Sequence, residues 1–287
     1  MIFVSSDNLV PGMCLGRDLN FYDSAMLTAV NLKAGTKLTD ANITQMKRTD
    51  LDGAYIDDAK SVVRVISSIN SEIKNEAISG VKNLANDFMG SGVTGEDVDE
   101  IGDTTEKLID TLSSHSDIMV NIADIKMYDD YTFHHSLSVS IMALAIGMEL
   151  GLNKKQLTEL GLSGLLHDIG KVLIPIEIIN KPGRLTPEEF NIVKMHPIHA
   201  ANHLIERKLV PPDSYYGIVG HHEKMDGTGY PRGLKGDEIH KYARILAVAD
   251  VFDALTSQRP YRKPSPPSEA IEYRMGGMGS HFDEDCV

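Results

Sequence analysis

Apolar residues recur every three or four positions through the middle of the chain. One series runs from Val62 to Phe88 and a second from Ile101 to Ile122, with the glycine-rich segment 90–95 between them. This spacing places side chains on one face of an α-helix, so it predicts two amphipathic helices. The second series has a heptad spacing, which is typical of helices that pack against a partner. Its apolar face could therefore pack against the rest of the chain or form the seam of a dimer.

The pattern beyond residue 126 predicts a series of helices. Asn153 can cap one of them, and Thr186 is followed by proline and then by Glu189, an order typical of a helix start with a capping box. We expect the helix that begins at Thr186 to continue through His196. The apolar spacing predicts further helices over residues 131–150, 213–222 and 241–257.

The first 58 residues have a different pattern. Short apolar segments at Met13–Leu19 and Met26–Leu32 predict strands, and Thr39–Leu51 predicts one helix capped by Thr39 or Asp40. We interpret this part as a regulatory or docking module. The sequence therefore predicts a mainly α protein, with a small mixed α/β module in residues 1–58, a helical linker in 59–125 and an all-helical domain in 126–287.

The composition and charge of the chain limit its partners. The 287 residues are 42% hydrophobic and 24% charged, as in globular proteins, which excludes wholesale disorder. The 28 Lys and Arg residues stand against 41 Asp and Glu, a formal net charge of -13. This balance excludes a global cationic surface for a nucleic acid polymer. An anionic substrate would need metal ions or a local group of basic residues.

The chain carries few signs of export or membrane insertion. Cys14 and Cys286 lie near opposite ends and form no CxxC pair, so we expect neither a disulfide framework nor a thiolate zinc site. The first residues lack the charged and apolar regions of a signal peptide. The longest apolar run, Leu137–Leu150, is too short and too rich in serine to span a bilayer. We therefore expect a cytoplasmic protein without a membrane segment.

Histidine is distributed unevenly. Ten of the 11 histidines lie between His134 and His281, which indicates chemistry in the second half of the chain. His167 and Asp168 end an apolar helix, where we expect Gly170 to relax the backbone so that both side chains reach one point. A histidine nitrogen and a carboxylate that can bridge are suitable ligands for a pair of divalent metals. Lys171 follows and could neutralise a phosphate oxygen.

Asp250 is a second informative position. It interrupts the apolar segment 245–252, where an unpaired carboxylate would be costly to bury. A metal ion would neutralise this charge, and the alternative is an ion pair with a nearby Lys or Arg. Further candidate ligands are His135, His196, His221 and His222.

A glycine-rich loop, DGTGYP at residues 226–231, follows His221 and His222. With it, residues 126–285 resemble the HD-GYP family of HD-superfamily phosphohydrolases. Six ordered blocks carry the resemblance: YTFHHS (131–136), LLHDIGK (165–171), KPGRLTPEEF (181–190), MHPIHAA (195–201), HHE to GYP (221–231) and YARILAVADVFDALTSQRPYR (242–262). Such an ordered set is far more specific than any one motif.

The resemblance implies roles for individual residues. The implied metal ligands are His135, His167, Asp168, His196, His221, His222 and Asp250, with Asp168 as the bridge between two ions. The implied phosphate-binding residues are Lys171, Arg259 and Arg262, and Tyr230 lies in the loop that lines the substrate pocket. Asp253 resembles a residue that orients a ligating histidine. His199 and His203 match no ligand of the family and are expected to lie outside the site.

The same resemblance implies the cofactor and the reaction. Family members with three metals carry a glutamate where this chain has Tyr131, so we expect two divalent ions, iron or manganese. The implied activity is hydrolysis of cyclic di-GMP to pGpG, and onward to GMP, by a hydroxide that bridges the metals, with His167, Asp168 and Lys171 as the catalytic residues. The alternatives are a catalytically weak cyclic di-GMP sensor or interaction module of the same fold, and a hydrolase of nucleoside phosphates, which the DGTGYP loop disfavours. A homodimer through the linker and signalling protein partners are further expectations.

Overall fold

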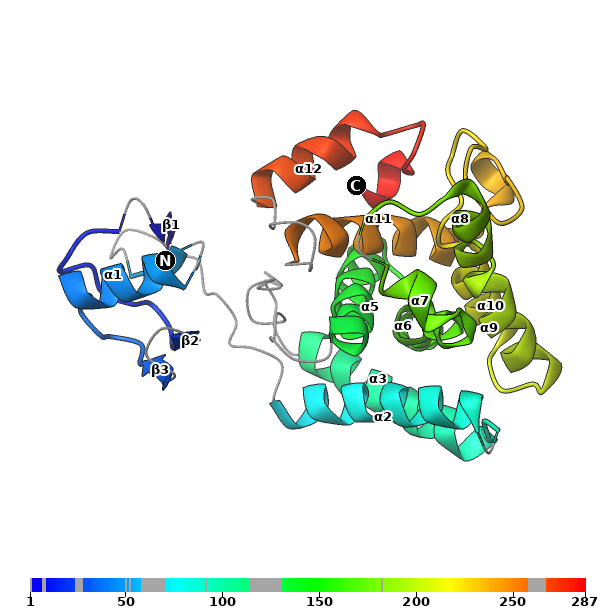
Figure 1. The fold of residues 1–287 in the computed structure, drawn as a ribbon, viewed down its shortest axis with the longest axis horizontal. Helices are drawn as coiled ribbons and strands as arrows, with labels where there is room; N and C mark the ends of the chain where they lie inside the picture. The colour runs from blue at the N-terminus through cyan, green and yellow to red at the C-terminus, as the bar shows by residue number, and fades with distance from the viewer. Residues whose placement is uncertain are drawn as a thin grey trace. The chain divides into compact units, whose positions relative to one another are not determined.

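The computed structural model describes residues 2–6, 9–23, 28–49, 51, 53–57, 71–90, 92–113, 131–181, 183–257 and 267–287. The chain forms two compact units, Met1–Ser67 and Ser68–Val287, and is mainly helical, as predicted (Figure 1). The predicted boundaries after residues 58 and 125 lie outside the described residues, as do Arg259 and Arg262. Within the described ranges, no helix is long and apolar enough to cross a membrane.

The smaller unit combines two strand pairs with one helix. β1 (Ile2–Ser5) pairs antiparallel with β4 (Gly53–Ile56), and β2 (Leu19–Asp23) pairs antiparallel with β3 (Thr28–Leu32). The helix α1 (Asp40–Arg48) begins at the predicted cap, Thr39, whose side chain accepts a hydrogen bond from the backbone of Asn42. A small hydrophobic core of its own joins these elements.

The prediction of a strand at residues 13–19 is wrong. Cys14 and Leu15 form only isolated bridges, to Lys37 and Ile56 respectively. The strands β1 and β4 were not predicted, because their pairing joins residues about 50 positions apart and leaves no local pattern in the sequence. The mixed α/β character of the module is nevertheless as predicted.

In the larger unit, α2 (Ser71–Met89) and α3 (Gly95–Ser113) pack against α5 (Tyr131–Glu149) and α6 (Lys154–Leu166). The apolar stripes of α2 and α3 lie in the same core as residues of α5 and α6. Leu84, Ile101 and Leu108, for example, are at most 1% exposed. Packing within the chain therefore accounts for the described part of both stripes, and α2 and α3 lie in the larger unit, Ser68–Val287.

A second core lies on the other side of α5. It joins α5 to α11 (Lys241–Thr256), α12 (Pro267–Gly276) and the short turn η4 (Glu284–Cys286). Phe282 is 1% exposed in this core, and the neighbouring Asp283 accepts a hydrogen bond of 2.7 Å from Arg244 on α11. The C-terminal segment therefore packs firmly on α11.

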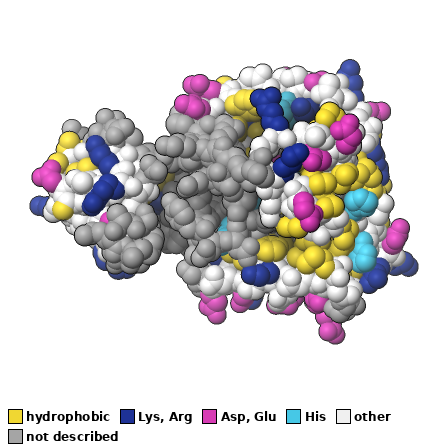
Figure 2. All heavy atoms as spheres, in the orientation of Figure 1, with side chains coloured by type: hydrophobic (Ala, Val, Ile, Leu, Met, Phe, Trp, Pro, Cys, Tyr) yellow, Lys and Arg dark blue, Asp and Glu magenta, His cyan; other side chains and the backbone are white. Residues whose placement is uncertain are grey.

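The remaining elements lie between α6 and α11 in the sequence. They are η2 (Ile169–Leu173), α7 (Ile176–Ile179), α8 (Pro187–Val193), α9 (His196–Glu206), α10 (Pro212–Gly220) and η3 (Gly236–Glu238). On the face drawn in Figure 2, hydrophobic side chains gather over the larger unit. Exposed large hydrophobic residues on and beside η2, α7 and α8 are Leu173, Ile176, Ile179, Phe190, Ile192 and Met195.

The segment after Thr186 confirms one prediction and corrects another. Thr186 and Glu189 form the predicted capping box at the start of α8. The helix does not continue through His196, because α8 ends at Val193 and α9 begins at His196. Pro197 explains the break, since in a continuous helix its ring would collide with the carbonyl group of Val193. The carbonyl oxygen of Val193 is thereby free to accept a hydrogen bond from His196.

Candidate metal centre

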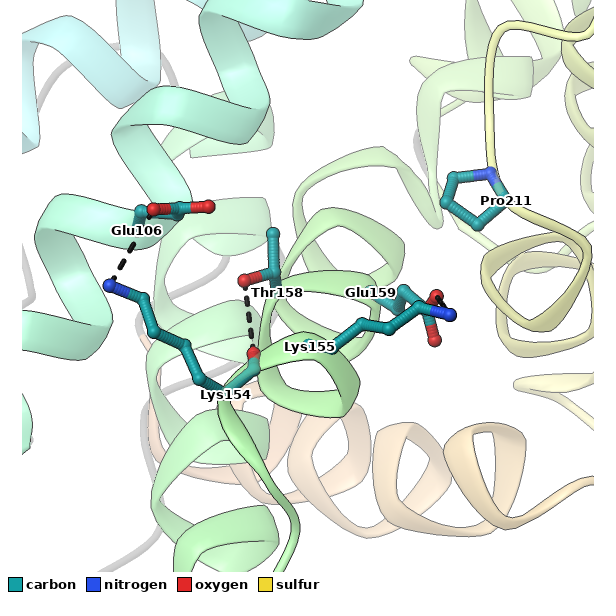
Figure 3. A pocket seen from close by; sticks show the side chains of 6 residues that line it. All are labelled: Glu106, Lys154, Lys155, Thr158, Glu159 and Pro211. Atoms are coloured by element: carbon teal, nitrogen blue, oxygen red, sulfur yellow. Dashed lines mark hydrogen bonds and ion pairs between the residues drawn. The ribbon is translucent and has the colours of Figure 1, made fainter.

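One pocket of the larger unit contains none of the predicted site residues. It is lined by residues of α3, α6 and the segment before α10, namely Glu106, Lys154, Lys155, Thr158, Glu159 and Pro211 (Figure 3). Each of its lysines faces a carboxylate: Lys154 is 3.5 Å from Glu106, and Lys155 is 3.7 Å from Glu159. Because these charges are compensated within the pocket, we place no chemistry there.

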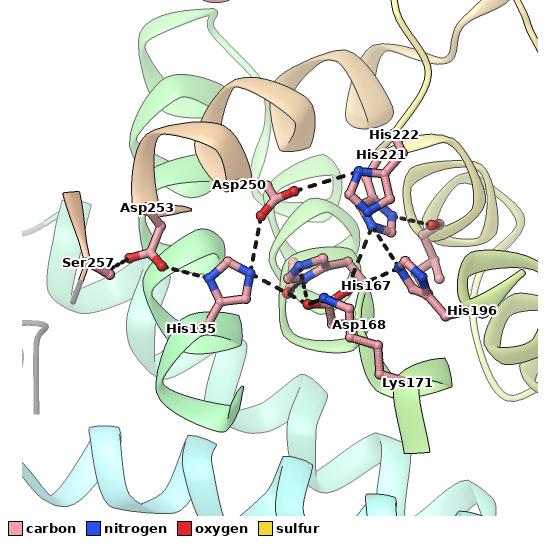
Figure 4. Close-up of polar contacts among 12 residues, drawn as sticks. His135, His167, Asp168, Lys171, His196, His221, His222, Asp250, Asp253 and Ser257 are labelled. Atoms are coloured by element: carbon pink, nitrogen blue, oxygen red, sulfur yellow. Dashed lines mark hydrogen bonds and ion pairs between the residues drawn. The ribbon is translucent and has the colours of Figure 1, made fainter. Parts of the chain in front are cut away.

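The seven residues predicted as metal ligands come together in the larger unit (Figure 4). Their ligand atoms form two groups, each with all atoms within 4.8 Å of one another. One group is Asp168, His196, His221 and His222, and the other is His135, His167 and Asp250. They come from five places in the fold: α5, the turn after α6, the start of α9, the end of α10, and α11.

Asp168 lies between the two groups. Its Oδ1 atom is 3.2 Å from Nε2 of His196 and 3.9 Å from Nε2 of His221. Its Oδ2 atom is 3.4 Å from Nε2 of His167 and 3.6 Å from Nε2 of His135. One carboxylate oxygen therefore faces each group, which is the arrangement that a bridging ligand requires.

Gly170 allows η2 and the start of α9 to approach each other, a role that the sequence did not predict. We expected this glycine to relax the backbone after the His-Asp pair, but Gly170 does not have the positive φ angle that only glycine adopts easily. Instead, a Cβ atom at this position would overlap the carbonyl oxygen of His196. The missing side chain lets η2 approach the start of α9, which brings Asp168 within reach of His196.

Three histidines share one hydrogen-bonding arrangement. Nδ1 of His167, His196 and His221 lies 2.6–2.7 Å from the carbonyl oxygen of the residue three positions earlier. A carbonyl oxygen only accepts, so each Nδ1 carries the proton and each Nε2 presents a lone pair to the site. This is the tautomer in which an imidazole binds a metal through Nε2.

The unpaired atoms of the site fit a bound cation. Nε2 of His196 and Nε2 of His221 lie 3.4 Å apart, so two lone pairs face each other. Nε2 of His167 and Oδ1 of Asp168 are buried and have no hydrogen-bond partner among the described residues. Buried lone pairs without a donor are unfavourable. Imidazole and carboxylate groups in this arrangement can hold divalent metal ions.

His135 connects the second group to α11. Its Nε2 is 3.1 Å from Oδ1 of Asp250, and its Nδ1 is 2.6 Å from Oδ2 of Asp253. Burial opposes protonation, but the hydrogen bonds to these two aspartates raise the pKa of His135 to about 9. A metal ion that binds this ring must therefore displace a proton.

The other ligands have the charges that metal binding requires. Burial opposes ionisation of Asp168, yet the charge of Lys171 holds the pKa of that carboxyl well below its usual range. Among the described residues, Asp250 contacts His135 and His222 and pairs with no Lys or Arg, which was the alternative. Despite burial, the hydrogen bond with His135 holds the pKa of the Asp250 carboxyl well below the usual range. Burial lowers the pKa of His222 to about 3.

The DGTGYP loop folds back on the end of α10. The backbone N–H of Tyr230 donates to the carbonyl oxygen of His222, and the rings of these residues lie 4.7 Å apart. A Cβ atom on Gly229 would lie 2.5 Å from Cα of Glu223, so only glycine fits this close approach. Burial, together with the charges of Asp250 and Asp168, raises the pKa of the Tyr230 hydroxyl.

Glu223 is a structural residue of this site that the sequence analysis did not single out. It is 2% exposed, and its carboxylate oxygens accept hydrogen bonds from the backbone N–H groups of Arg232 and Leu234 at 2.7 and 3.1 Å. These bonds hold the far end of the DGTGYP loop. Its place in the HHE segment was the available signal, because a buried carboxylate directly after two predicted metal ligands must find hydrogen-bond donors of its own.

Lys171 is the cation closest to the site among the residues described. Its Nζ forms an ion pair with Oδ2 of Asp168, and its side chain is 32% exposed. Arg259 and Arg262, the other predicted phosphate-binding residues, lie outside the described part of the chain. Their roles stay predictions.

Comparison with known proteins gives a consistent result. The HD domain family model matches residues 106–286. The chain is 40% identical over 187 residues to a cyclic di-GMP phosphodiesterase of Pseudomonas aeruginosa, covering 65% of this chain and 45% of that protein. It is 39% identical over 154 residues to 3′3′-cGAMP-specific phosphodiesterase 1 of Vibrio cholerae, covering 54% of this chain and 35% of that protein. The chain spans less than half the length of these curated relatives.

A solved structure shares the fold. An HDG"Y"P protein from Bdellovibrio bacteriovorus superposes with a TM-score of 0.61 at 18% sequence identity, covering 99% of this chain and 96% of that one.

Proposed function

Because this chain belongs to the HD domain family, we propose that it is a metal-dependent phosphodiesterase that hydrolyses cyclic di-GMP to pGpG, with GMP as a further product. The observation that carries the proposal is the position of Asp168. Its two oxygens face two separate groups of histidine and aspartate ligands, as a dinuclear phosphodiesterase requires. The relatives named as cyclic dinucleotide phosphodiesterases support the choice of substrate class.

We assign two divalent ions, iron or manganese, to this site. One would be held by Asp168, His196, His221 and His222, and the other by Asp168, His135, His167 and Asp250. Tyr131, in place of a glutamate, favours two ions over three. When bound, such ions supply an activated water near neutral pH and withdraw charge from the scissile phosphate.

The protein's own residues prepare the site for an anion. Asp168 and Asp250 are held ionised and His222 neutral, so these three ligands are in the state that binds cations. Lys171 presents a partly exposed ammonium group beside Asp168, where it can donate a hydrogen bond to a phosphate oxygen. We assign Arg259 and Arg262 to the same task and Tyr230 to the wall of the pocket.

The product defines which bond breaks. Water adds to one phosphorus atom, and the bond between that phosphorus and the 3′ oxygen breaks, because pGpG keeps its phosphate on the 5′ oxygen. The 3′ oxygen leaves with the electron pair of that bond and takes up the proton that the attacking water loses, which gives the 3′ hydroxyl group. Ion pairs of the developing negative charge with Lys171 and the two arginines would stabilise the transition state.

The test is metal analysis and turnover on one preparation. Protein purified without oxygen should contain two metal ions per chain and should form pGpG from cyclic di-GMP with Fe(II) or Mn(II). Asp168→Asn should lose most of the metal and the activity. Asp110→Asn, which changes an exposed carboxylate on α3, should lose neither.

Two results would count against the proposal. Retention of both ions by Asp168→Asn would contradict the bridging role. If the metal-loaded protein binds cyclic di-GMP tightly but forms no product, the protein is a cyclic di-GMP sensor and not an enzyme. Hydrolysis of 3′3′-cGAMP in preference to cyclic di-GMP would keep the reaction and correct the substrate.

A further inference from the structure

An aromatic corner lies beside the metal centre. The ring of Phe190 on α8 meets the ring of Tyr230 edge to face, with centroids 6.2 Å apart. Tyr230 in turn lies 4.7 Å from the ring of His222, which is itself 5.2 Å from His196. A continuous series of rings therefore leads from the ligand histidines to Phe190.

The outer end of this series is open to solvent. Phe190 is 42% exposed, although a large aromatic side chain gains from burial. Phe190 lies on α8, which directly precedes α9 and its first residue, His196. Its ring contact with Tyr230, which in turn contacts His222, holds the exposed ring near the ligands. An exposed aromatic ring at this distance from a phosphate-cleaving centre is suited to contact the organic part of a substrate.

Lys194 adds a positive charge to the corner. Its Nζ lies 4.7 Å from the centre of the Phe190 ring and 5.9 Å from that of Tyr230. An ammonium group over both rings restrains their positions and attracts electron-rich surfaces. The combination of flat rings and a cation resembles the stacking platforms on which proteins bind nucleobases.

We propose that Phe190 and Tyr230 form the stacking site for one purine base of the substrate, with Lys194 as the cation that holds the two rings. Phe190 would contact the base, and the ligand histidines would lie on the side of the phosphate. This inference rests on the proposed function, because it assigns the base of a nucleotide whose phosphate lies at the metal centre. It adds a residue, Phe190, to those that select the substrate.

Calorimetry with GMP and ribose 5-phosphate separates the base from the phosphate. The two probes share the phosphate, so their difference in affinity measures the contact with the base. On the metal-loaded wild-type protein GMP should bind at least tenfold more tightly than ribose 5-phosphate. Phe190→Ala should weaken GMP binding about tenfold and leave the affinity for ribose 5-phosphate unchanged, since one stacked base contributes a factor of about this size.

Two further variants test the role of the ring. Phe190→Trp keeps an aromatic surface and should retain the preference for GMP. Ile192→Ala removes an exposed apolar side chain from the same helix and should change neither affinity. An equal loss of GMP affinity in Phe190→Ala and Ile192→Ala would indicate damage to α8 and would overturn the proposal.

Kinetics separate this inference from the proposed function. With cyclic di-GMP, Phe190→Ala should raise KM about tenfold while kcat stays within twofold. If the wild type does not hydrolyse cyclic di-GMP but shows the base preference, the proposed function fails and the stacking site stands. If hydrolysis occurs and Phe190→Ala keeps the full preference for GMP, the stacking site is wrong. Equal wild-type affinities for GMP and ribose 5-phosphate would also overturn it.

Discussion

Oδ2 of Asp253 lies 2.6 Å from Nδ1 of His135, joining α11 to α5 across 118 positions of sequence. Both side chains are buried, and the contact turns Nε2 of His135 towards Asp250 and Asp168. Ser257 donates a hydrogen bond of 2.9 Å to the other oxygen of Asp253. The orientation of His135, a predicted metal ligand, is therefore set by Asp253. This carboxylate lies one helical turn after Asp250, another predicted ligand.

We predict that Asp253→Asn weakens metal binding by about 10- to 100-fold, because an amide holds His135 less firmly and makes its ring less basic. The helical content should not change. Competition with a chelator measures the affinity, and circular dichroism measures the fold. Ser257→Ala is the matched control, since it removes only the outer hydrogen bond and should have a smaller effect. Wild-type metal affinity in Asp253→Asn would show that His135 is oriented by other contacts.

Gly229→Ala should displace the loop that carries Tyr230. The added Cβ would lie 2.5 Å from Cα of Glu223, where neither backbone can yield without moving the loop. We expect kcat/KM for cyclic di-GMP to fall at least tenfold while the metal content stays unchanged, because no ligand of the metals lies in the loop itself. Steady-state kinetics and metal analysis of the same preparation give both values.

Gly102→Ala provides the control for the glycine change. Gly102 lies inside α3, and a Cβ there meets no described atom within 4 Å. The substitution should stabilise the protein by about 0.5–1 kcal/mol, since alanine loses less backbone entropy in a helix than glycine does. Its activity should equal that of the wild type. Equal activity losses in both variants would mean that the loop is not the cause.

The sequence predicted the site better than it predicted the contacts that build it. The seven ligands could be named because the ordered sequence blocks resemble those of the HD-GYP family. The residues alone drew attention to His167 and Asp168 at a helix end and to Asp250 within an apolar helix. Asp253 was predicted from its position one turn after Asp250. The role predicted for Gly170 was wrong. This glycine allows η2 to approach the start of α9, and a close approach between elements distant in sequence leaves no local signal.

Pro197 is a local signal for the break after Val193, because its ring collides with the preceding turn of a continuous helix. The helix was nevertheless predicted to continue through His196, whereas α8 ends at Val193. Two other features lay beyond the reach of local patterns. The pairing of β1 with β4 and the packing of α2 and α3 on α5 and α6 are contacts between distant segments. Apolar spacing predicts which face of a helix is covered, but not by which chain or element it is covered.

His203 should make the stability of the protein depend on pH. Its Nε2 is buried without a partner among the residues described, and burial, aided by the charge of Arg207, lowers its pKa. The unfolded chain binds a proton near pH 6.5, whereas the folded chain resists it. The contribution of His203 to stability is therefore present above about pH 6.5 and is lost as the pH falls below it.

Urea unfolding between pH 7.5 and 5.5 measures this dependence. His203→Leu, which keeps an apolar contact with Phe88, should lose less stability than the wild type over this range. His199→Gln, on the same helix but exposed, serves as the control and should follow the wild type. An identical slope for His203→Leu and the wild type would assign the acid sensitivity to other groups.

Lys171 should act on the substrate and not on the metals. Its ammonium group touches Asp168 but is not itself a metal ligand, because it has no free lone pair when charged. We predict that Lys171→Met lowers kcat/KM for cyclic di-GMP by about 10- to 100-fold, the loss expected for one charge-assisted hydrogen bond of about 1.5–3 kcal/mol. The metal content should stay at the wild-type value, because His167 and His196 also lower the pKa of the Asp168 carboxyl. Lys155→Met, whose side chain is 85% exposed on α6, should have no effect. Loss of metal together with activity in Lys171→Met would instead make this lysine a support for Asp168.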